Sequence, residues 1–176
     1  MMKMKISALC SFILLTSAAA IDAAPIVPQD GLWRGDATGG SVEDCNPMME
    51  NMLQNNGAFT QKGETRRIEW GGKFDPNSMN IFNEEGAPMA WESTGENSYK
   101  GKIFDGSSCA NADTSSCTRV GATVTMQLIS PTKIEGTTLV ELGTLMGDTE
   151  AMAALKQMGM ADCKVNVTYD VQRVGD

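Results

Sequence analysis

The sequence predicts an all-β domain with two short helices, in which about eight antiparallel strands form an up-and-down barrel. Two observations lead to this prediction. Apolar and polar residues alternate along much of the chain, as where Val124, Met126 and Leu128 alternate with threonine and glutamine. The segments between the alternating stretches are short and rich in Gly, Pro, Asn and Asp, which is typical of hairpins. A two-sheet β-sandwich has the same pattern and is the alternative fold.

The strands are expected at residues 32–38, 65–74, 79–83, 88–93, 99–104, 122–129, 134–142 and 164–174. The first strand is expected to stop at Gly39 and Gly40. A helix is expected to begin at Pro47 with Asn46 as its N-cap. A second helix, capped by Asp148 or Thr149, is expected to end at Gly159.

Residues 1–23 have the features of a secretory signal peptide. Lys3 and Lys5 give a basic start, the apolar stretch that follows is too short to span a bilayer, and small residues precede Pro25. Cleavage is expected between residues 20 and 24, which leaves a single domain at residues 24–176. The sequence therefore predicts a periplasmic or secreted protein whose mature chain has no membrane span.

The cysteines beyond the predicted signal are Cys45, Cys109, Cys117 and Cys163. An even number of cysteines in an oxidising compartment indicates disulfides, with several possible pairings. The short loop between Cys109 and Cys117 favours a local bridge, which leaves Cys45 to pair with Cys163. This second bridge would stabilise the fold by about 4–5 kcal/mol in the chain-entropy model.

Charge and composition exclude several classes of function. The formal net charge of −8 argues against binding to nucleic acid, whose phosphates attract basic proteins. The chain has no histidine, which excludes a Ser-His-Asp triad, a Cys-His dyad and a His-ligated zinc site. The thioethers of the many methionines are soft ligands for Cu(I), but their helical spacing favours packing. The sequence predicts no enzyme activity, no cofactor and no metal.

The opening Gly31-Leu32-Trp33 and the late Arg173 resemble a feature of the lipocalins and related calycin barrels. In those families an arginine of the last strand packs over a tryptophan of the first strand. The resemblance implies that Trp33 and Arg173 are neighbours at the closed end of a barrel.

The chain also resembles a family of small exported proteobacterial proteins of unknown function. The resemblance rests on Gly31-Leu32-Trp33, Tyr99-Lys100-Gly101 and Arg173-Val174-Gly175-Asp176. Members of that family usually have a cysteine directly after the closing aspartate, and this chain has Cys163 instead. The resemblance implies a compartment and a style of fold, and no activity.

These observations predict a non-enzymatic binding module that holds a small apolar ligand inside the barrel. Inward-facing side chains and methionines of the two helices, which would form a lid, are the expected contacts: Tyr99, Val124, Met126, Leu128, Met52, Met152 and Met158. The alternative is a protein that binds or inhibits an envelope protein through its acidic surface and the Cys109–Cys117 loop. A filled core would favour this alternative.

Overall fold

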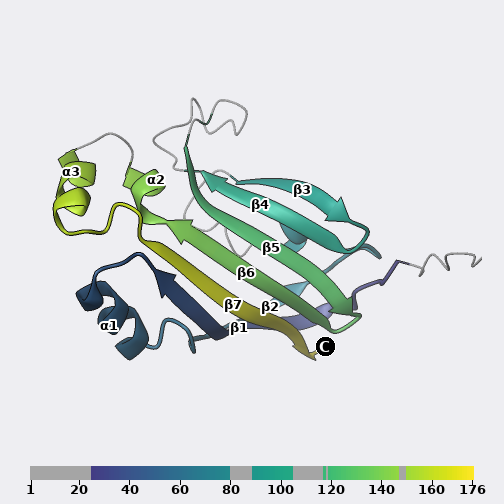
Figure 1. The fold of residues 1–176 in the computed structure, drawn as a ribbon. Helices are drawn as coiled ribbons and strands as arrows, with labels where there is room; N and C mark the ends of the chain where they lie inside the picture. The colour runs from purple at the N-terminus through teal and green to yellow at the C-terminus, as the bar shows by residue number, and fades with distance from the viewer. Residues whose placement is uncertain (1–24, 80–88, 105–116, 118, 147–149) are drawn as a thin grey trace, which may run out of the picture.

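The computed structural model describes residues 25–79, 89–104, 117, 119–146 and 150–176. These residues form one antiparallel sheet of seven strands, with helices at one end (Figure 1). The strands are β1 (Gly31–Glu43), β2 (Lys62–Ile68), β3 (Met89–Gly95), β4 (Ser98–Phe104), β5 (Val120–Ser130), β6 (Lys133–Glu141) and β7 (Lys164–Gly175). The helices are α1 (Pro47–Asn55), α2 (Leu142–Met146) and α3 (Glu150–Gln157), and a 3-10 turn, η1 (Pro76–Met79), follows β2.

The strand order is β2-β1-β7-β6-β5-β4-β3. The first and last strands are neighbours, as a barrel requires, but β2 lies outside β1 and forms one edge while β3 forms the other. Within the described residues the sheet is therefore open between β2 and β3. The prediction of an antiparallel all-β fold is confirmed, and the closed barrel is not.

The first strand is longer than predicted. It continues through Gly39 and Gly40 to Glu43, and a register shift between Ala37 and Gly39 takes up the extra residue. Gly40 is required for packing, because a Cβ at this position would collide with the ring of Phe59. A pair of glycines predicts a strand end, but here Gly40 lies within the strand and makes room for the ring of Phe59.

Three further elements differ from the prediction. The strand expected at residues 65–74 is β2, which begins earlier, at Lys62, and ends at Ile68. Met79, expected to begin a strand at residues 79–83, belongs to the η1 turn, and the rest of that expected strand lies outside the described residues. Leu142, expected at the end of a strand, begins helix α2. The helix expected before Gly159 is confirmed as α3, whereas its proposed caps, Asp148 and Thr149, lie outside the described residues, as does the predicted signal peptide.

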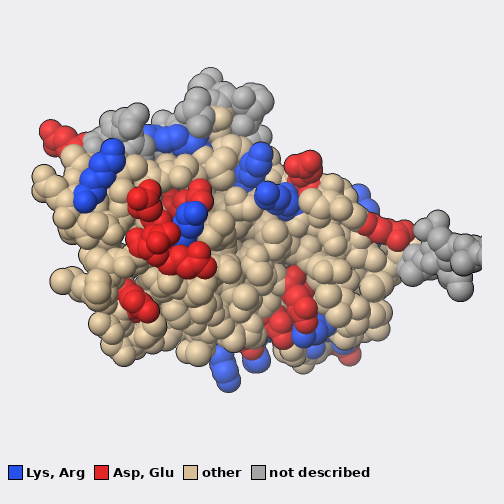
Figure 2. Space-filling model, viewed as in Figure 1, with Lys and Arg blue, Asp and Glu red and all other residues tan. Residues whose placement is uncertain are grey.

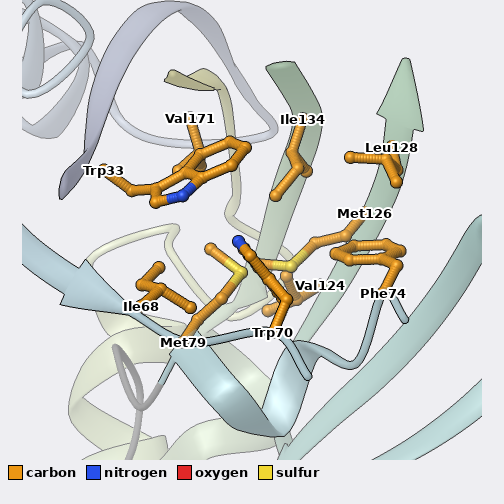
Figure 3. Close-up of a cluster of buried hydrophobic side chains, with 10 residues drawn as sticks. All are labelled: Trp33, Ile68, Trp70, Phe74, Met79, Val124, Met126, Leu128, Ile134 and Val171. Carbon is orange, nitrogen blue, oxygen red and sulfur yellow. The ribbon is translucent and has the colours of Figure 1, made fainter. Parts of the chain in front are cut away.

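The main core lies between one face of the sheet and the segment that follows β2. Inward-facing side chains of the strands meet aromatic side chains of this segment, and rings of Trp33, Trp70 and Phe74 form edge and tilted contacts (Figure 3). The buried members of the main core are Trp33, Ile68, Trp70, Phe74, Met79, Val124, Met126, Leu128, Ile134 and Val171.

A second, smaller apolar cluster lies at the helical end of the sheet. Leu155, Met160 and Cys163 are its buried members, and Cys45, Met49, Leu142, Met152 and Val165 pack around them. We call this group the end cluster. The predicted disulfide between Cys45 and Cys163 is confirmed and passes through it. The predicted N-cap is also confirmed, because Asn46 Oδ1 accepts a hydrogen bond from the backbone N–H of Met49 at 2.8 Å.

Candidate functional site

The residues expected to line a ligand cavity lie in the main core. Val124, Met126 and Leu128 are at most 2 % exposed and contact other core side chains (Figure 3). Tyr99 packs against the same core, and its hydroxyl donates a hydrogen bond to the Phe74 carbonyl at 3.2 Å. Protein side chains therefore fill the space around these four residues.

The methionines predicted to form a lid do not lie together over this core. Met152 packs into the end cluster, whereas Met52 and Met158 are about half exposed, at 47 % and 49 %. The helices that carry or adjoin them extend from one end of the sheet (Figure 1). The segment after β2 covers the core instead.

The predicted pair of Trp33 and Arg173 is adjacent in the structure. The two residues are directly opposite each other across β1 and β7. Trp33 Nε1 donates to the Gln29 carbonyl at 3.0 Å, while Arg173 Nε donates to the Asp30 carbonyl at 2.9 Å and its Nη2 pairs with Asp176. Gly31 makes room for the guanidinium, because a Cβ there would be 2.8 Å from Arg173 Nε. The pair fixes the ends of the first and last strands in an open sheet.

The second predicted disulfide is described only in part. Cys117 is disulfide-bonded, but Cys109 lies outside the described residues.

A groove of about 570 Å³ lies on the opposite face of the sheet from the main core. Most of the residues that line it are polar, although apolar atoms make up more of its exposed surface than polar atoms do. Hydroxyl groups form a row across its floor. Thr125, Thr137 and Thr168 occupy matching register positions on β5, β6 and β7, and Thr38 of β1 continues the row. The hydroxyls of Thr125 and Thr137 share a hydrogen bond of 2.6 Å, and Thr38 donates to Thr168 at 3.4 Å. We call these four threonines the hydroxyl row.

A row of carboxylates runs parallel to the hydroxyl row. Glu135, Asp170 and Asp36 are direct cross-strand neighbours on β6, β7 and β1. Like charges in such positions repel each other. Lys133 Nζ offsets the repulsion by pairing with Glu135 at 2.7 Å and Asp170 at 3.1 Å, and Arg34 pairs with Asp36 at 2.9 Å. Lys62 of β2 lies opposite Asp36 and also acts on its carboxylate, so the three carboxylates of the row have three neighbouring cations.

These ion pairs shift the pKa values of two of the groups that form them. The hydrogen bond from Arg34 lowers the pKa of Asp36 below its ordinary value. Hydrogen bonds to Glu135 and Asp170 raise the pKa of Lys133. Asp36 and Lys133 therefore keep their charges near neutral pH.

Uncharged side chains separate the groups of charges on this face. In the space-filling view, charged residues gather towards the margins, and an uncharged area lies over β5, β6 and β7 (Figure 2). Lys100, which is opposite Thr125 on β4, provides a cation at the side of the groove away from the carboxylate row. Tyr99 and Tyr169 also border the groove, but their rings pack on the core side of the sheet. The groove therefore offers hydroxyls, an amide and charges, without an aromatic platform.

The described residues offer few groups for catalysis. None of their polar or charged residues is classed as buried, and they include no group of three or more His, Cys, Asp or Glu side chains placed to hold a metal ion. No helix among them is long and apolar enough to cross a membrane. The arrangement is suited to hydrogen bonding and charge recognition on an open surface.

Comparisons with protein-family models, with curated proteins and with solved structures find no match to this chain. The groove must therefore be interpreted from its own chemistry. Sequence reasoning missed the groove. The alternation of Thr125 with Val124 and Met126 was a usable signal on one strand, but the strand register was needed to bring threonines of four strands into one row.

Proposed function

We propose that the protein is an exported, non-enzymatic binding protein that binds a protein partner in the groove over the hydroxyl row. The open groove, with its hydroxyl row and charged side chains, carries this proposal. Sites for small apolar ligands are concave and mostly apolar, whereas the apolar residues of this sheet pack into the main core. A filled core favours the second of the two predicted functions, recognition of another protein.

The electrostatics of the protein favour a partner with basic side chains. The carboxylates of the row have cationic neighbours, but the chain as a whole has a net charge of −8, and this field attracts a cationic partner. A cationic side chain next to Asp170 would reduce the repulsion among the carboxylates. Complementary charge also accelerates encounter and makes binding weaker at high ionic strength.

Site-specific photo-crosslinking tests the proposal. A photoreactive amino acid replaces Gln127, which is exposed beside the carboxylate row, and in a matched control it replaces Lys73, which is exposed on the segment after β2. We expect a discrete crosslinked protein from position 127 in expressing cells and none from position 73. Adding Glu135→Lys should abolish the product, because it reverses the charge next to Asp170. Equal crosslinking from both positions, or none from position 127, would contradict the proposal.

A further inference from the structure

The methionines at the helical end divide into two sets. Met49, Met152 and Met160 pack in the end cluster. Met48, Met52 and Met158 are exposed, at 79 %, 47 % and 49 %. The other large hydrophobic side chains that are exposed in the described residues, Val27, Ile129 and Val174, belong to the opposite end of the sheet. Among the residues whose exposure the structure describes, the exposed large apolar side chains at the helical end are thus all thioethers.

The backbone brings these three exposed methionines to one place. Met48 and Met52 are four residues apart in α1, so they lie one above the other on the same side of the helix, with Cβ atoms roughly 6 Å apart. Met158 lies beside the start of α1, because Asn46 Nδ2 donates a hydrogen bond to the Met158 carbonyl at 3.1 Å. Asn46 also caps α1 through its other side-chain atom, and this fixes the start of the helix against Met158.

Packing does not account for this set. A side chain that is 79 % exposed adds little to the apolar area that folding buries. Thioethers are soft ligands that select soft cations such as Cu(I), and they remain uncharged over the whole range of physiological pH. Flexible methionine side chains can also turn towards a shared ion without backbone movement.

We propose that Met48, Met52 and Met158 form a surface site for a soft monovalent cation of the Cu(I) class. The three sulfurs supply neutral ligands, and the cation keeps its charge when bound. Binding in this site needs no deprotonation, so its affinity does not change between about pH 5 and 7, unlike that of sites built from histidine or thiolate. The site is independent of the groove and of the function proposed for it.

Titration with Ag(I), a soft cation that needs no reductant and so spares the disulfides, tests the site. Native mass spectrometry of the protein in chloride-free buffer should show a retained silver ion at both pH values. The double variant Met48→Leu/Met52→Leu and the single variant Met158→Leu keep side-chain volume. Each should weaken binding by roughly tenfold or more.

Two matched variants complete the test. Met89→Leu removes a partly buried thioether of β3, and Glu50→Gln removes a hard carboxylate of α1. Neither should change silver binding. Absence of a retained ion would overturn the proposal, as would equal affinity in the wild type and the Met48/Met52 or Met158 variants, or a large loss of affinity at the lower pH.

Discussion

The main core and the end cluster are both apolar, but different interactions stabilise them. The main core has ten buried residues contributed by five strands and the segment after β2, and aromatic rings contact one another within it. The end cluster has three buried residues, one of which is half of a disulfide. The stability of a large core comes mainly from the apolar area that it buries, whereas the stability of a small cluster depends more on a covalent link such as a disulfide. The sheet and the helical end should therefore respond differently to the same kind of change.

Matched leucine truncations give the largest expected contrast. Leu128 is 1 % exposed in the main core, and Leu155 is 7 % exposed in the end cluster. We expect Leu128→Ala to lower the free energy of unfolding by about 4 kcal/mol, and Leu155→Ala by about 2 kcal/mol, because fewer atoms surround the second leucine. Urea denaturation of both variants measures the difference. Equal losses would show that the two clusters are equally well packed.

Removal of the Cys45–Cys163 disulfide separates the clusters more directly. The bridge closes a long loop, with a sequence separation of 118 between its two cysteines, so Cys45→Ala/Cys163→Ala should cost up to about 4–5 kcal/mol. Hydrogen exchange should accelerate in α1 and α3 and remain slow in the central strands β5 and β6, because local opening begins where buried contacts are few. Uniform acceleration would instead mean that the helical end and the sheet unfold as one unit.

A pH titration gives the smallest expected effect. Tyr169 packs against the main core, and its burial raises the pKa of the phenol above its ordinary value. The unfolded chain ionises this tyrosine above about pH 10 while the folded chain keeps it neutral. Its contribution to stability is therefore constant below that pH and is lost as the pH rises further. Tyr169→Phe should leave stability at neutral pH nearly unchanged and reduce the alkaline loss, as measured by denaturation at increasing pH. An unchanged alkaline profile would contradict this assignment.

Local signals predicted most of the strands. The alternation around Val124 and that of the last strand gave β5 and β7 to within two residues at each end. The helix start at Asn46 and Pro47 was also predictable, because capping and a proline at the first position depend on neighbouring residues only. The disulfide between Cys45 and Cys163 followed from the cysteine spacing.

Long-range features were not predictable from the same signals. Alternation assigns a residue to a face, but it does not say which strands pair, so the pattern alone predicts a closed barrel where the described sheet is open. The role of Gly40 depends on Phe59, which is distant in sequence. The hydroxyl row was not predictable for the same reason, because its threonines belong to four strands and are distant in sequence. The sequence also did not reveal that Met52 and Met158 are exposed, because packed and exposed methionines can have the same helical spacing.

The contact between the first and last strands has a topological consequence. Leu32 lies opposite Gly175, and Arg173 binds the backbone of Asp30, so the start of β1 and the end of β7 meet at the end of the sheet away from the helices (Figure 1). From β1 to β7 the path of the backbone is thus nearly a ring. A short linker from Asp176 to Asp30 would complete it, and new termini opened in the turn between β5 and β6 would leave the strand pairings intact. The fold is accordingly suited to circular permutation.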